Sequence, residues 1–184
     1  MDDLLIEYDV DKEPYIKTIT DDKIINLTGE SGSGKSTYSN KYKDDDNYII
    51  IDTDILFSKT STNNKYILDL REIFSYTDKM ILINNFDEFY IKVLNYFKDI
   101  DKTIIIDSAQ YRNIKDYSIL KGEVIIIRTS PVTCFKRVKQ RWINNHPNYD
   151  EDEYNNYVDR KKALLGWYES INDFILNVEK ISCK

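Results

Sequence analysis

Four short runs of apolar residues recur along the chain, and each ends at a glycine or a charged residue. They are rich in isoleucine and occupy residues 24–28, 48–51, 103–106 and 124–127. Continuous runs of this kind are typical of strands that are buried on both faces of a sheet. A weaker alternation over residues 15–19 predicts a short edge strand within an N-terminal extension, residues 1–22.

Apolar residues spaced three and four positions apart predict helices between and after these strands. The helical patterns cover residues 66–74, 86–97, 132–142 and a long region from 154 to 175 that is expected to break near Gly166. Asn85 is placed to cap the second helix, and Pro131 falls in the first turn of the third. Strands that alternate with helices indicate a parallel sheet covered on both faces. The sequence therefore predicts a three-layer α/β/α domain with a mostly parallel sheet.

The composition excludes several classes of protein. A chain of 184 residues with five glycines and three prolines fits a single domain over residues 1–184. The net charge of −6 argues against nucleic acid as a partner. Two cysteines and one histidine argue against a disulfide framework, a His-rich zinc site and a Ser-His-Asp triad. The acidic N-terminus shows neither a signal peptide nor a membrane span, so a cytoplasmic protein is expected.

One segment carries most of the chemical information. Residues 29–37 read GESGSGKST and match the pattern G-x-x-x-x-G-K-[ST], with a predicted strand before them and helix-compatible sequence after them. Glycines let such a loop curl until its backbone N–H groups point at phosphate oxygens, and a helix that starts there adds its positive end. In this pattern the lysine reaches the β- and γ-phosphates and the next hydroxyl ligates Mg²⁺. The residues expected to bind nucleotide are Gly29, Ser31, Gly32, Ser33, Gly34, Lys35, Ser36 and Thr37, with Ser36 on the metal.

The loop, the strand before it and the aspartates that end later strands resemble the P-loop NTPases over most of residues 23–180. Only the loop is highly specific. The chain has no N/T-K-x-D guanine signature and is shorter than most motor and transporter ATPases of this superfamily. The resemblance is therefore best to the nucleoside, nucleotide and small-metabolite kinases, and it implies a P-loop kinase-like fold with ATP and Mg²⁺ as cofactors.

Two carboxylates directly follow the second apolar run. Asp52 and Asp54 face the same crevice as the loop if the strand before them is parallel to the loop's strand. A carboxylate there can accept the proton of an attacking hydroxyl or hold water on Mg²⁺. The D-x-D spacing is similar to that of shikimate kinase and dephospho-CoA kinase. By that resemblance Asp52 lies nearer the metal and Asp54 nearer the acceptor.

A third carboxylate, Asp107, ends the third apolar run and looks like the Walker B aspartate that contacts Mg²⁺ through water. Asp52 competes with it for this role. Kinases of this branch often carry an arginine shortly after the Walker B strand, and Arg112 occupies that place here. Which of the three aspartates is the base and which hold the metal stays open.

Arg137 and Arg141 lie four residues apart on the third predicted helix, on a face turned away from its apolar stripe. Two guanidiniums side by side can clamp phosphates and neutralise charge that develops during transfer. The surrounding segment resembles the helix that leads into the lid of these kinases, which implies a lid over roughly residues 137–160.

Together these residues predict an ATP-dependent kinase that transfers the γ-phosphoryl group of MgATP to a small-molecule acceptor. The acceptor is a nucleoside, a nucleotide or a hydroxylated metabolite, and the protein is a monomer or a homodimer. Two alternatives stay open. One is an ATPase or nucleotide-dependent switch without an acceptor, and the other is a polynucleotide 5′-hydroxyl kinase, which requires a basic groove.

Overall fold

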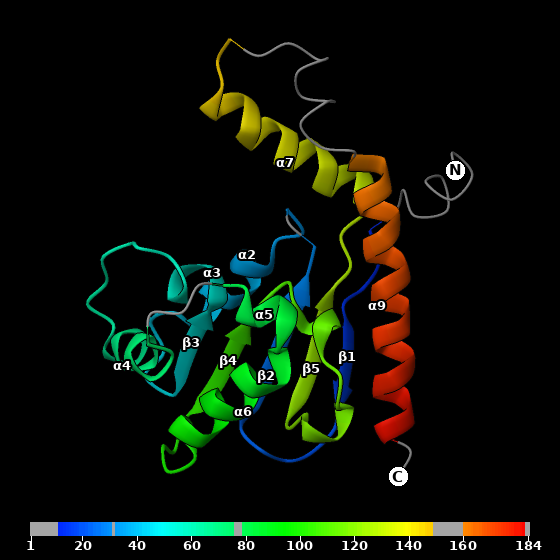
Figure 1. Cartoon of the computed structure of the whole chain (residues 1–184). Coiled ribbons are helices and arrows are strands. Elements are labelled where there is room, and N and C mark those ends of the chain that lie inside the picture. The colour runs from blue at the N-terminus through cyan, green and yellow to red at the C-terminus, as the bar shows by residue number, and fades with distance from the viewer. Residues whose placement is uncertain (1–10, 31, 76–78, 149–159, 183–184) are drawn as a thin grey trace.

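A five-stranded sheet forms the centre of the protein in the computed structural model, which describes residues 11–30, 32–75, 79–148 and 160–182 (Figure 1). The strand order is β1-β5-β2-β4-β3. The strands are β1 (Tyr15–Thr18), β2 (Ile24–Gly29), β3 (Tyr48–Asp52), β4 (Thr103–Asp107) and β5 (Glu123–Ile127). The four predicted runs pair in parallel, and the predicted edge strand is confirmed as β1, which pairs with β5 in the antiparallel sense. The mostly parallel α/β sheet is thus confirmed.

The helices are α2 (Lys35–Ser39), α3 (Thr53–Leu56), α4 (Lys65–Ile73), α5 (Ile81–Asn84), α6 (Phe86–Phe97), α7 (Pro131–Asn145) and α9 (Arg160–Ser182), with 3₁₀ turns η1 (Asn40–Tyr42), η2 (Tyr111–Asn113) and η3 (Tyr117–Ile119). The four longer helices, α4, α6, α7 and α9, follow the predicted apolar pattern with one correction, while residues 154–159 of the last predicted helix lie outside the described residues. Asn85 caps α6 by accepting from the Glu88 N–H at 3.2 Å, as predicted. The predicted break near Gly166 was wrong, because α9 continues through it. One glycine costs a helix only about 1 kcal/mol, which the packing of α9 against the core outweighs.

Helices cover the two faces of the sheet unequally. One face packs against α4, α5, α6 and α9 in a large apolar core that includes the fully buried Phe89, Ile106 and Phe174. On the opposite face, the buried apolar cluster consists of Leu27, Ile105 and Ile125. Among the helices, only α2 and η1 contribute side chains that pack against this cluster in the described residues, and these side chains are tyrosines. The predicted three layers are therefore incomplete in the described residues, since the segment between β2 and β3 forms only α2 and η1.

A buried asparagine fixes the centre of the sheet. Asn26, in β2, is 1% exposed, and its amide nitrogen donates to the carbonyls of Lys121 and Glu123 at 2.7 and 3.0 Å. Its side-chain oxygen accepts from the hydroxyl of the buried Tyr111 at 3.0 Å. Every polar atom of the amide group thus has a partner, which is the condition for burying it without a large loss of stability. The network fixes the position of the turn before β5 relative to β2.

The N-terminal extension braces the start of α7. The Lys12 N–H donates to the Arg128 carbonyl at 3.0 Å, and Arg128 Nε donates to the Glu13 carbonyl at 2.6 Å. Asp11 accepts from the N–H of Ser130, the residue that caps α7, at 2.7 Å. Residues 11–18 thus hold the junction from which α7 projects. Among the described helices, none has the length and apolar character needed to cross a membrane.

Candidate functional site

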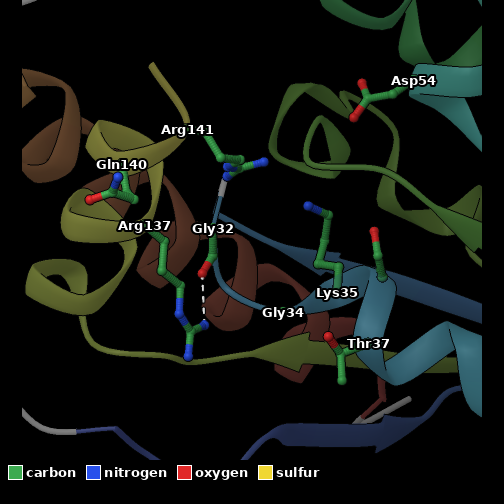
Figure 2. Close-up of a pocket in the computed structure, with 9 residues that line it drawn as sticks. Gly32, Gly34, Lys35, Thr37, Asp54, Arg137, Gln140 and Arg141 are labelled. Atoms are coloured by element: carbon green, nitrogen blue, oxygen red, sulfur yellow. Dashed lines mark hydrogen bonds between the residues drawn. The ribbon is translucent and has the colours of Figure 1, made fainter. Parts of the chain in front are cut away.

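A cavity of about 550 Å³ opens at the carboxyl end of the sheet, between the glycine-rich loop and α7 (Figure 2). Figure 2 shows Asp54 on one side, Arg137 and Gln140 on the other, and Lys35 between them. Carboxyl ends of parallel strands are the usual place for ligand sites in open α/β sheets. The cavity is lined by Gly32, Gly34, Lys35, Ser36, Thr37, Asp54, Arg137, Gln140 and Arg141.

Two glycines give the loop its shape. Gly32 has φ +81° and Gly34 has φ +96°, a left-handed backbone that residues with a side chain rarely adopt. A Cβ on Gly32 would also lie 2.8 Å from the carbonyl oxygen of Cys134, in α7. The loop and α7 therefore approach each other more closely than any side chain at position 32 would allow.

A Gly32→Ala variant tests this close approach. We expect it to lose about 1–3 kcal/mol of stability, because the left-handed backbone and the contact with Cys134 both resist a Cβ. Urea unfolding measures the loss. Gly166→Ala in α9, where an added Cβ meets no atom within 4 Å, is the control, and it should be as stable as the wild type or up to about 1 kcal/mol more stable. Equal stability of the Gly32→Ala variant and the wild type would contradict the described loop geometry.

Side chains from α7 and the residues before it hold the loop carbonyls. Arg137 donates to the Gly32 carbonyl at 2.9 Å, and the Thr129 hydroxyl donates to the Ser33 carbonyl at 2.5 Å. Arg141 also lines the cavity, but Figure 2 shows its guanidinium pointing in a different direction from that of Arg137. The two arginines reach the same cavity as predicted, yet they do not lie side by side, because Arg137 is turned toward the loop backbone.

Two strand-end aspartates lie side by side in the sheet. Asp52 and Asp107 are aligned partners across β3 and β4, so their side chains lie on the same face of the sheet. Asp107 is 3% exposed and accepts weakly from the Ser39 hydroxyl at 3.5 Å. Burial raises the pKa of Asp107 to about 6, with the positive charge of Lys35 opposing and the charge of Asp52 adding to the shift. The pKa of Asp52 is also raised, again mainly by burial.

Asp52 has a structural role that the sequence did not distinguish from a catalytic one. Its Oδ1 accepts from the N–H groups of Asp54 and Ile55 at 2.9 and 3.4 Å and thereby caps α3. This single-turn helix was not predicted from the apolar pattern. It turns the side chain of Asp54, which is exposed, toward the cavity.

The remaining predicted residues have mixed outcomes. Neither Gly29, which ends β2, nor Ser33 lines the cavity. Ser33 is buried, and its hydroxyl has no hydrogen-bond partner among the described residues. Ser31 lies outside the described residues. Of the lid predicted over roughly residues 137–160, the first part belongs to α7, and residues 149–159 lie outside the described residues. Arg112 is half-buried in η2 and is not among the cavity residues. Gln140, which sequence reasoning missed, lies between the two arginines on α7 and could have been found from that spacing.

The donors at the loop suit a hard cation. The Ser36 hydroxyl and the carboxylates of Asp52 and Asp107 are oxygen ligands of the kind Mg²⁺ takes, and Mg²⁺ usually keeps waters and substrate phosphates besides one or two carboxylates. Within the described ranges, no cluster of three or more His, Cys, Asp and Glu side chains could hold a metal. A magnesium ion at this place would thus depend on nucleotide phosphates for part of its coordination, which fits the sparse donor set.

No protein-family model matches the chain, and no curated protein matches it closely enough to count as a relative.

Proposed function

We propose that the protein is an ATP-dependent kinase that phosphorylates a hydroxyl group of a small molecule. The observation that carries the proposal is a single cavity in which Asp54 faces the GKS end of the glycine-rich loop and two arginines of α7. This combination suits phosphoryl transfer, because a carboxylate on one side of the phosphates can orient or deprotonate the acceptor while cations stabilise the charge that develops.

Each residue has a distinct part in the proposed reaction. Backbone N–H groups of the loop and Lys35 bind the phosphates, and Arg141 supplies a second positive charge across the cavity. Asp54 accepts the proton of the acceptor's hydroxyl group while the oxygen of that hydroxyl forms a bond to the γ-phosphorus. The bond from that phosphorus to the bridging oxygen breaks, and ADP leaves with the electron pair.

Magnesium, when bound with ATP, would neutralise phosphate charge, and Ser36, Asp52 and Asp107 are the residues that would hold it. Asp107 contributes a buried carboxylate whose pKa is raised by burial, and a bound cation would favour its ionised form. Lys35 is near enough to lower that pKa, so it already supplies part of the compensation.

The test is ATP consumption by the pure protein with Mg²⁺, measured with and without a panel of acceptors. The panel contains nucleosides, nucleotides, hydroxylated metabolites and 5′-hydroxyl oligonucleotides. Stimulation by one small-molecule class, with a phosphorylated product identified by mass spectrometry, is the expected result. Equal hydrolysis with every acceptor would favour an ATPase or switch instead, and stimulation by oligonucleotides alone would favour a polynucleotide kinase.

A further inference from the structure

The turn that carries Asp54 cannot be stable by itself. Helix α3 has four residues, and helices this short do not form without outside support because the first turn fixes several residues for one hydrogen bond. It also leaves the N–H groups at its start and the carbonyls at its end without partners inside the helix. Whatever satisfies these two ends determines where Asp54 points.

The two ends of α3 are satisfied by side chains of opposite charge. Asp52 accepts the free N–H groups at the start, as described above. At the other end, Arg71 of α4 donates from Nε to the Leu56 carbonyl at 3.1 Å and from Nη2 to the Ile55 carbonyl at 2.8 Å. A carboxylate at the start and a guanidinium at the end both complement the helix dipole.

The same guanidinium also contacts the backbone outside α3. Arg71 Nη2 also donates to the carbonyl of Thr60, in the loop between α3 and α4, at 3.0 Å. All three acceptors are backbone carbonyls. Arg71 is half-buried and is not among the residues that line the cavity. Its guanidinium therefore joins α3, the following loop and α4 into one unit and does not contact the cavity itself.

We infer that Arg71 is a positioning residue for phosphoryl transfer, which acts by holding α3 so that Asp54 faces the glycine-rich loop. The inference rests on the proposed function for its catalytic part and on the three hydrogen bonds for its structural part. Because Arg71 lies outside the cavity, its loss changes the orientation of Asp54 and leaves the nucleotide contacts in place. We therefore expect loss of Arg71 to lower kcat and the rate at which the acceptor is phosphorylated, while the affinity for ATP stays unchanged.

The variants are Arg71→Ala and Arg71→Lys, with Lys65→Ala as the control for loss of a positive charge from the exposed face of the same helix. Lysine keeps the charge but lacks the planar fork that reaches three carbonyls, so Arg71→Lys is expected to restore only part of the function. We expect Arg71→Ala to lower kcat on the order of tenfold to a hundredfold, the loss that a small misplacement of a catalytic group causes.

Amide hydrogen exchange supplies a readout that does not depend on activity. Arg71→Ala is expected to speed exchange over residues 53–60 at least about tenfold, with exchange in α6 and the ATP dissociation constant close to wild type. Unchanged exchange over 53–60 would overturn the structural part. Faster exchange with normal kcat would overturn the catalytic part. A wild-type protein that transfers no phosphate to any acceptor would instead overturn the proposed function, while the exchange result would still decide whether Arg71 holds α3.

Discussion

Replacing Lys35 with methionine is expected to reduce ATP turnover on the order of a hundredfold to a thousandfold. Lys35 is the cation at the centre of the cavity, between Asp54 and the arginines of α7, and removing one preorganised donor of this kind costs about that much. Methionine preserves the unbranched stem, which passes close to Gly29. The loss should therefore come from the missing charge and not from a cavity in the packing.

Steady-state ATP hydrolysis or transfer, with nucleotide binding by calorimetry, measures this effect. Lys43→Ala removes a positive charge from an exposed position just after η1 and should leave both quantities unchanged. A Lys35→Met protein that binds and turns over ATP like the wild type would remove the basis of the proposed site.

An Asp107→Asn variant should be more stable than the wild type at neutral pH and yet inactive. Burial raises the pKa of Asp107 from its ordinary 3.8 to about 6, so the folded protein holds this proton more tightly than the unfolded chain. The resulting stability is complete below about pH 3.8 and is lost as the pH rises through about 6. Above that pH the folded protein keeps a buried charge that asparagine does not have, at a cost of up to about 3 kcal/mol.

Urea unfolding at about pH 5 and about pH 8 checks the sign of this linkage. The advantage of Asp107→Asn should be largest at the higher pH and shrink at the lower one, whereas Asp46→Asn, in an exposed loop, should show no such trend. MgATP should stabilise the wild type more than the variant. A variant less stable than the wild type at both pH values would mean that Asp107 serves the fold instead of a ligand.

The strands were predictable because a strand that is buried on both faces appears in the sequence as a continuous run of apolar residues. The runs that end at Gly29, Asp52 and Asp107 gave the positions of three strands, and the motif gave the loop. The loop's close approach to α7 was not predictable, because it depends on the backbone of Cys134 meeting Gly32. The same holds for the direction of Arg137, since a helix face does not tell which backbone carbonyl a side chain reaches.

The contacts of Arg71 with α3 and the following loop could not be predicted from the sequence either. An arginine in an amphipathic helix usually indicates a solvated face, and its three acceptors are carbonyls, which every residue has. Helix α3 was missed because four residues are too few to show a period of 3.6. The edge strand β1 was visible only as a weak alternation, since one of its faces is exposed.

The strand order has a consequence for how the chain folds during synthesis. Central β2 lies between β4 and β5, which are both made after it, and β1 is aligned with β5 so that Tyr15 meets Ile126. Pairings between such distant segments form slowly because the intervening chain must first be closed into a loop. Strands β1 and β2 therefore leave the ribosome before their partners, and the apolar β2 must avoid other chains until β4 and β5 emerge. Completion of the described sheet is thus a late event, in which β1 is joined to β5.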